Sequence, residues 1–148
     1  MTGAPWINQT GFLYALDYKA AGTIDNYAHN HWVDRPPVLV EDLMQRAYAT
    51  AQSTPSGSAA ADSGVLRQAA ALSVRLVEFT QHYRSAGESE SRVAAVATVS
   101  EVNPGRVRSA VFQTSAQAPS ADAAGGARAM AEASDRLIEQ IFLWAAAR

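Results

Sequence analysis

The chain contains 148 residues, 48% of them hydrophobic and 18% charged, and its formal net charge is −2. This composition is typical of one soluble globular domain, so we expect residues 1–148 to form a single domain, and the absence of a lysine- and arginine-rich block argues against nucleic acid as a partner. Without cysteine the chain has no disulfide, thiolate nucleophile or zinc–thiolate site, and no apolar run reaches the roughly 20 residues of a membrane-spanning helix.

Two stretches near the start of the chain alternate in the manner of β-strands. Residues 10–18, TGFLYALDY, predict a strand with one buried face, and a turn follows over residues 19–23. Residues 24–32, IDNYAHNHW, alternate again and predict a second, short strand. The first strand would separate two sets of side chains, Phe12, Tyr14 and Leu16 on one face and Leu13, Ala15 and Asp17 on the other.

A helix is predicted over residues 36–52, where apolar residues recur at helical spacing. Asp34 is the expected N-cap, and the two prolines after Arg35 suit a first helical turn. Glu41 is interpreted as a first-turn acid whose negative charge stabilises the positive end of the helix. Residues 53–64, STPSGSAAADSG, are small, polar and of low complexity, and they predict a mobile loop.

Three further strands are predicted in the second half of the chain, over residues 71–83, 91–102 and 106–116. The turn signals between them are GESES at 87–91 and NPGR at 103–106. Because the connections are so short, we expect these strands to form an antiparallel meander.

The chain closes on its longest predicted helix, over residues 121–146. Ser120 is the expected N-cap, and Asp122 would lie in the first turn, where negative charge is favoured. One apolar stripe runs along this helix, made by Ala127, Met130, Ser134, Leu137, Ile138, Ile141, Trp144 and Ala145.

These elements predict the fold class. Each helix has a single apolar face, and most of the strands alternate between apolar and polar residues. Both patterns are satisfied when two helices pack on one face of a mainly antiparallel sheet. We therefore expect a two-layer α+β fold.

The spacing of His29 and His31 places both imidazoles on one face of the second strand, which a metal ion could use. Asp25 or His82 could supply a third ligand. A pair of histidines two residues apart is a weak signal, and the interpretation we favour is that both belong to the polar face of an exposed strand. We therefore predict no metal site.

No set of residues carries the pattern of a catalytic site. Asp34 and Glu41 could form a carboxylate pair, but their place at a helix start explains them better. No serine stands in a G-x-S-x-G context, and AGGA at 124–127 lacks the Gly-Lys-Ser/Thr ending of a phosphate-binding loop. We predict a binding or assembly domain with no enzymatic activity, no catalytic residue and no cofactor.

Trp6, Trp32 and Trp144 are the largest side chains, and packing in or beside the core is the interpretation we favour for them. The alternative is that one of them lines an apolar groove for a lipid or a protein partner. The polar side of the last helix mixes both signs of charge, which is typical of a solvated face and not of a membrane-binding one; its charged residues are Arg128, Glu132, Asp135, Arg136 and Glu139.

Residues 4–47 resemble the core of the ABC-type transport auxiliary lipoproteins, the PqiC-like lipoproteins. The resemblance is carried by a Pro-Trp segment, a tyrosine-containing strand, a Tyr-Ala strand that ends near a tryptophan, and a proline-rich helix start with leucines beyond it. In this chain these features are Pro5 and Trp6, Tyr14, Tyr27 and Ala28 with Trp32, and Pro36 and Pro37 with Leu39 and Leu43. Residues 76–83 and 105–145 resemble the later strands and closing helix of the same family.

The resemblance implies a non-enzymatic accessory protein in the envelope of a Gram-negative bacterium. Its partners would be the ABC transporter subunits and a mammalian-cell-entry (MCE) domain protein of the same operon, with lipid as the transported cargo. It implies a periplasmic domain tethered to the outer or inner membrane by an N-terminal lipid, added to a precursor that carries a signal peptide and a lipobox cysteine. Anchor or docking roles would fall to Tyr14, Tyr27, Trp32 and Trp144.

Two other functions remain open at this point. The helices and the sheet could enclose an apolar pocket, which would make the chain a periplasmic carrier of a lipid or another small molecule. The third possibility is a hydrolase or a metal enzyme, for which no residue pattern speaks.

Overall fold

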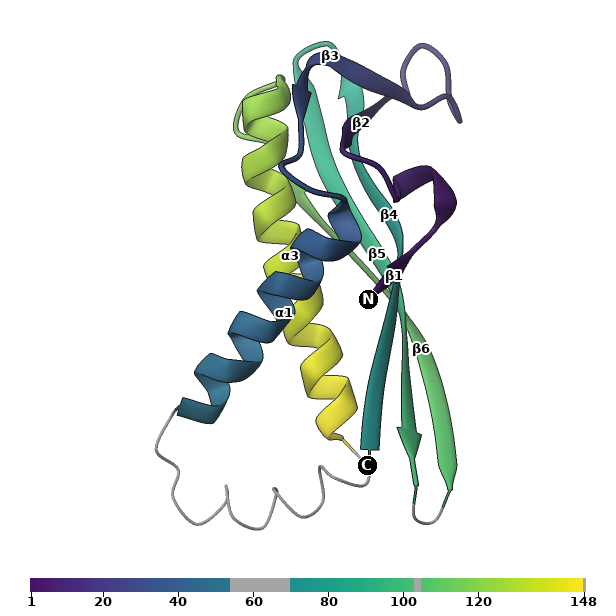
Figure 1. The fold of residues 1–148 in the computed structure, drawn as a ribbon. Helices are drawn as coiled ribbons and strands as arrows, with labels where there is room; N and C mark the ends of the chain where they lie inside the picture. The colour runs from purple at the N-terminus through teal and green to yellow at the C-terminus, as the bar shows by residue number, and fades with distance from the viewer. Residues whose placement is uncertain (54–69, 103–104, 148) are drawn as a thin grey trace.

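The computed structural model describes residues 1–53, 70–102 and 105–147. These residues form a six-stranded sheet in which five strands follow the order β3-β2-β4-β5-β6, and a further short strand, β1 (Thr2–Gly3), pairs with β4. Two helices, α1 (Pro36–Ser53) and α3 (Ala123–Ala146), lie on one face of the sheet (Figure 1). The predicted two-layer α+β fold is therefore confirmed.

The three long strands form the predicted antiparallel meander, with ends within three residues of those predicted. They are β4 (Ala70–Ser85), β5 (Glu88–Glu101) and β6 (Arg106–Gln117). The turn expected over residues 87–91 is shorter, because β5 already begins at Glu88. The loop predicted over residues 53–64 lies outside the described residues except for Ser53, which ends α1.

The first strands join the sheet in a way that the sequence did not suggest. β2 (Gly11–Leu16) and β3 (Asp25–His31) pair as an antiparallel hairpin, but β2 lies parallel to β4, and β1 does the same. The sheet is thus mixed, since the chain crosses from β3 over the helix face before it returns as β4.

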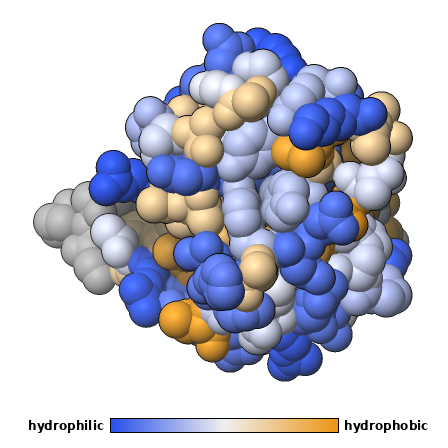
Figure 2. Space-filling view, turned by 90° about the horizontal axis from the view of Figure 1, so that it is seen from above, coloured by the Kyte–Doolittle hydropathy of each residue, from blue (hydrophilic) through white to orange (hydrophobic). Residues whose placement is uncertain are grey.

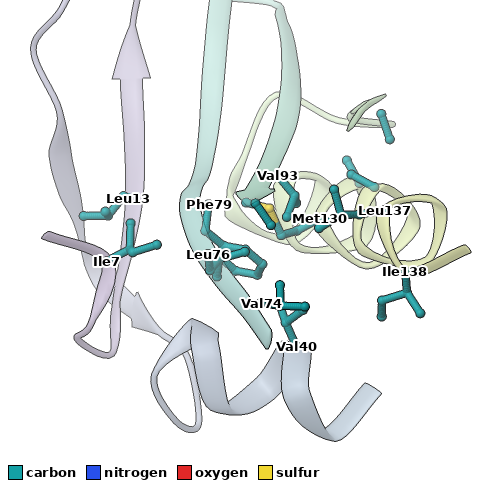
Figure 3. Packing of buried hydrophobic residues seen from close by; sticks show 14 of the residues in the cluster. Ile7, Leu13, Val40, Val74, Leu76, Phe79, Val93, Met130, Leu137 and Ile138 are labelled. Carbon is teal, nitrogen blue, oxygen red and sulfur yellow. The ribbon is translucent and has the colours of Figure 1, made fainter. Parts of the chain in front are cut away.

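The prediction that β2 has one buried face is wrong. Phe12 and Leu13 point to opposite faces, yet each is at most 5% exposed. The second face is covered by a single 3-10 turn, η1 (Pro5–Ile7), whose Ile7 is fully buried and lies beside Leu13 (Figure 3).

The core lies between α3 and the long strands. Met130 and Leu137 of α3 are buried over Val93 of β5, and Leu76 and Phe79 of β4 continue the cluster (Figure 3). Fully burying one such side chain stabilises the fold by about 1.5–3 kcal/mol. The predicted stripe of α3 is the face that packs, although its members Ala127, Trp144 and Ala145 are only half-buried.

Both predicted N-caps need correction. Asp122, and not Ser120, caps α3: its carboxylate accepts the N–H of Gly125 at 2.7 Å, while the Ser120 hydroxyl donates to the same carboxylate at 2.7 Å. The hydroxyl donation from Ser120 and then the N–H of Gly125 lower the pKa of Asp122. The helix therefore starts two residues later than a serine cap would allow.

Asp34 does not cap α1, for a reason that lies in the sequence. An N-cap side chain binds the second or third helical N–H, and after Asp34 these positions are Pro36 and Pro37, which have no N–H. Asp34 instead accepts the N–H of Arg35 at 2.7 Å. Glu41 lies beyond the first turn, so the first-turn role expected for it is also wrong.

Gly125 offers a test of how closely the start of α3 packs. A Cβ at this position would overlap the main chain of Ser120, whereas a Cβ at Gly87 would meet nothing within 4 Å. We expect Gly125→Ala to lower the free energy of unfolding by about 1–3 kcal/mol, because the overlap outweighs the higher helix propensity of alanine. Chemical denaturation measures the change.

Gly87→Ala is the matched control and should leave the free energy of unfolding within about 0.5 kcal/mol of its starting value. Equal stability of the two variants would contradict the close approach of Ser120 to α3.

Candidate functional site

Three of the four predicted anchor residues lie together in an aromatic cluster. The ring of Tyr27 lies 4.5 Å from that of Tyr14 and 5.0 Å from that of Phe12, and Phe12 stacks on Trp32 at 4.4 Å between centroids. Trp32 also meets Phe79 of β4 edge-on at 5.2 Å. The cluster fixes the β2–β3 hairpin to β4 and therefore has a clear packing role.

A buried hydrogen-bond network continues from this cluster to the start of α3. The Tyr27 hydroxyl lies 2.5 Å from that of Tyr83 and donates to the side-chain Oε1 of Gln81 at 2.7 Å. The Gln81 amide nitrogen donates to Ser89 Oγ at 2.8 Å and to the main-chain oxygen of Asp122 at 3.0 Å. Burial, and then the hydrogen bond with Tyr83, raise the pKa of Tyr27, so its hydroxyl stays protonated.

Trp144, the fourth predicted anchor, lies apart from the other three. Its ring meets Phe112 of β6 edge-on at 5.5 Å, and the Arg108 guanidinium lies 4.7 Å from the ring centroid. Arg108 also donates to the main-chain oxygens of Trp144 and Ala145 at 3.1 and 2.9 Å. This arginine satisfies carbonyls at the negative end of α3, so Trp144 belongs to the closure of that helix on the sheet.

The histidines singled out in the sequence do not come together. His29 and His31 are exposed on β3, whereas His82 lies on β4 between two carboxylates. In the described ranges 1–53, 70–102 and 105–147, no three His, Asp or Glu side chains gather closely enough to hold a metal ion. Asp34 pairs with Arg35 and Glu41 contacts the Met1 amine, so these two acids are not paired with each other.

His82 is the centre of a polar depression that the sequence did not indicate. Its Nδ1 lies 3.0 Å from Asp17 Oδ2, and its Nε2 lies 2.7 Å from Glu78 Oε1. The hydrogen bond to Glu78 raises the pKa of His82 against the opposing effects of burial and of Arg92. The depression has a volume of about 210 Å³, and Arg92 is neutralised within it by Glu90 at 2.8 Å.

An apolar groove of about 320 Å³ lies between α1, β4 and α3. Four α1 residues spaced along one helix face line it, and two of them, Met44 and Tyr48, face Leu72 and Val74 of β4 and Phe142 of α3. Tyr48 and Phe142 meet edge-on with centroids 6.4 Å apart. None of the three tryptophans lines this groove, so none of them contributes to an apolar binding surface at this place.

The surface at the opposite end of the molecule, beside β3, is different. Seen from that end, apolar residues form small separate patches among hydrophilic ones (Figure 2). Tyr14, Tyr27 and Trp32 are half-buried and Phe12 is buried, so the cluster mainly serves packing, and the groove between the helices is the candidate ligand site. In the part of the chain that the structure describes, no helix has the length and apolarity needed to cross a membrane.

Comparison with known proteins gives a family and a fold. A family model described as the ABC-type transport auxiliary lipoprotein component matches residues 16–142. The crystal structure of protein XCC0632 from Xanthomonas campestris is similar, with a TM-score of 0.75, 19% identity, and coverage of 97% of this chain and 78% of that one. A second crystal structure, of an uncharacterised protein, has a TM-score of 0.67 at 11% identity, with 97% and 84% covered. No curated protein matches.

The Tyr27 hydroxyl provides a test of the buried network. Tyr27→Phe keeps the aromatic ring but leaves the fully buried Gln81 without its donor, which should cost about 1–3 kcal/mol of unfolding free energy. Tyr14→Phe is the control, since the Tyr14 hydroxyl makes no hydrogen bond with any residue of the described ranges. Thermal and chemical denaturation measure both variants, and an equal loss in the two would show that the network contributes nothing.

His82 predicts a pH dependence of stability. Because its pKa is raised in the folded state, the imidazolium contributes stability that is complete below the unfolded pKa of about 6.5 and is lost as the pH rises through the folded pKa. The melting temperature of the wild type should exceed that of His82→Gln most clearly near pH 6, and the difference should shrink on the alkaline side.

The control for this titration is His29→Gln, whose side chain is exposed on β3. The melting temperature of this variant should change with pH in the same way as that of the wild type. A difference in melting temperature between His82→Gln and the wild type that stays constant from pH 6 to pH 9 would rule out the charged form of His82 as a source of stability.

Proposed function

Since the chain belongs to the family of ABC-type transport auxiliary lipoprotein components, we propose that it serves a lipid-transport system as a non-enzymatic docking component. The match over residues 16–142 is the observation that carries this proposal, because it spans α1, most of α3 and the strands β3 to β6. Membership associates the chain with an ABC transport system and with the cell envelope.

The finer proposal concerns partners and place. We propose that the domain lies in the periplasm, tethered to the outer or inner membrane by the lipid of its precursor. Its partners would be ABC transporter subunits and an MCE-domain protein of the same operon. The predominance of packing contacts among the conspicuous aromatic and charged residues supports a role in assembly more than one in catalysis.

The open face of the sheet supports docking as the mode of action. The helices cover only one face of β4, β5 and β6 (Figure 1). On the other face Ser73, Thr98 and Ser109 follow one another across the three strands, flanked by exposed Val107 and Val111. Exposed Arg75 lies beside Ser73 on this face. These five residues themselves carry no charge, so another protein can cover their patch at little desolvation cost.

The groove favours a second candidate function, that of a periplasmic carrier. Its lining by Met44, Tyr48, Leu72, Val74 and Phe142 suits an acyl chain or another apolar group. In that case lipid would bind between α1, β4 and α3, and docking would serve delivery.

Co-purification with the MCE-domain protein of the same operon tests the leading proposal. We expect the lipid-anchored, full-length protein to retain that protein, extracted from membranes in mild detergent, because the exposed patch around Ser109 and Val111 offers a surface for it. Val111→Lys and Ser109→Glu together place charge on this face and should abolish retention, while Leu143→Lys, an exposed substitution on α3, should not.

Retention by the double variant that equals retention by the wild type would remove the sheet face from the proposal. A wild-type protein that retains no partner, yet carries a lipid in native mass spectrometry, would replace docking by the carrier function. The matched groove variant is Leu72→Glu, which should then lose the lipid.

A further inference from the structure

The two edges of the sheet differ in how they are protected. Edge strands expose unpaired main-chain groups, and proteins usually blunt them with charges, bulges or short length. β3, at one edge, has seven residues, an irregular register against β2, and the polar side chains Asp25, His29 and His31. β6, at the other edge, has twelve residues, and its stretch 109–117 contains neither a charged residue nor a proline.

The free hydrogen-bonding groups of β6 can be assigned from the register. Ala118 donates its N–H to Ser89 on the β5 side, and the Ser115 carbonyl accepts from Arg136 on the outer side. Even-numbered residues therefore bond to β5, and odd-numbered residues turn their N–H and C=O toward the edge. Within the described part of the chain, the edge groups of Val107, Ser109, Val111 and Gln113 have no partner.

We propose that this edge pairs with the same edge of a second copy of the chain, antiparallel and centred on Ala110. The stretch 107–113 is symmetric about Ala110, so a two-fold axis there pairs all four of these residues at once. Ser109 then faces Val111 of the second copy, and Val107 faces its Gln113. The two sheets become one continuous sheet.

The side chains on the helix face fit this register. Ala110 meets its own copy, which needs only a small side chain, and Arg108 meets the ring of Phe112 from the second copy. The two Arg108 guanidinium groups stay four residues apart along the strands. No like charges face each other across the axis.

Neighbouring registers are less favourable. A pairing centred on Ser109 would place the two Arg108 side chains diagonally across the axis, where like charges repel. A pairing centred on Val111 would set Val107 against Ser115, whose carbonyl already accepts from Arg136 at 2.8 Å, so two such bonds would be lost. Exposed Val107 and Val111, 66% and 73% accessible, lose part of that exposure in the favoured register.

Disulfide trapping tests the register directly, because the chain has no other cysteine. The two Ala110 positions form a non-hydrogen-bonded pair with Cα atoms about 4.5 Å apart, within the range that a disulfide spans. We expect Ala110→Cys to form a covalent dimer under mild oxidation. Gln113→Cys is the control and should remain a monomer on a non-reducing gel, since its thiols would lie far apart.

Sedimentation velocity supplies the independent readout. The wild type should sediment with twice the 15.7 kDa mass of the chain. Val111→Pro should be monomeric with an unchanged circular dichroism spectrum, because it removes an N–H that bonds to no described residue of the chain, and Val111→Thr should stay dimeric. A monomeric wild type, a dimer that survives Val111→Pro, or equal cross-linking through Gln113→Cys would overturn the proposal.

Discussion

The side chain of Gln81 is fully buried, so its amide must find hydrogen-bond partners inside the protein, and those partners come from three separate parts of the chain. Tyr27 belongs to the β2–β3 hairpin, Ser89 to β5, and Asp122 to the cap of α3. A wrong position of any one of them would leave a polar group unpaired in the core, at a cost comparable to a large part of the stability of a small domain. The network therefore specifies how these three parts meet.

The β2–β3 hairpin depends most strongly on this hydrogen-bond network. β2 reaches β4 through a short parallel ladder, from Tyr14 against Gln81 to Leu16 against Tyr83. Such a ladder contributes little by itself, so the aromatic rings around Tyr27 and the hydrogen bond between His82 and Asp17 supply the rest of the attachment. At the far end of α3 the Arg108 contacts close the helix on β6 without any part in this network.

The parts of the fold that the sequence predicted are those that depend on residues close together in the chain. The helices and the three long strands were predicted to within a few residues, because period and turn residues are local properties. The parallel pairing of β2 with β4 and the burial of Leu13 by Ile7 depend on residues far apart in the chain, for which periodicity gives no sign. The Asp34 cap was wrong although its cause, two prolines without an N–H, stands in the sequence.

The candidate sites show the same limit. Tyr14, Tyr27 and Trp32 were rightly singled out as conspicuous, but their conspicuousness reflects packing, and the groove formed instead around Tyr48 and Phe142. A helix face of Glu41, Met44, Gln45 and Tyr48 could have been read from the spacing of α1 alone; its partners Leu72 and Val74 could not. Nothing in the sequence placed His82 between Asp17 and Glu78.

The positions of the three surfaces bear on how they could work together. The groove lies on the helix side, against β4, whereas the unprotected edge belongs to β6, two strands away. Pairing of two copies through β6 would leave both grooves open and would bring the two patches around Ser109 and Val111 side by side on one sheet face. A partner that covers this face in two copies at once gains avidity without any new type of contact, since the second contact forms at a high local concentration. Dimerisation and docking would then strengthen each other while ligand access to the groove stays independent of both.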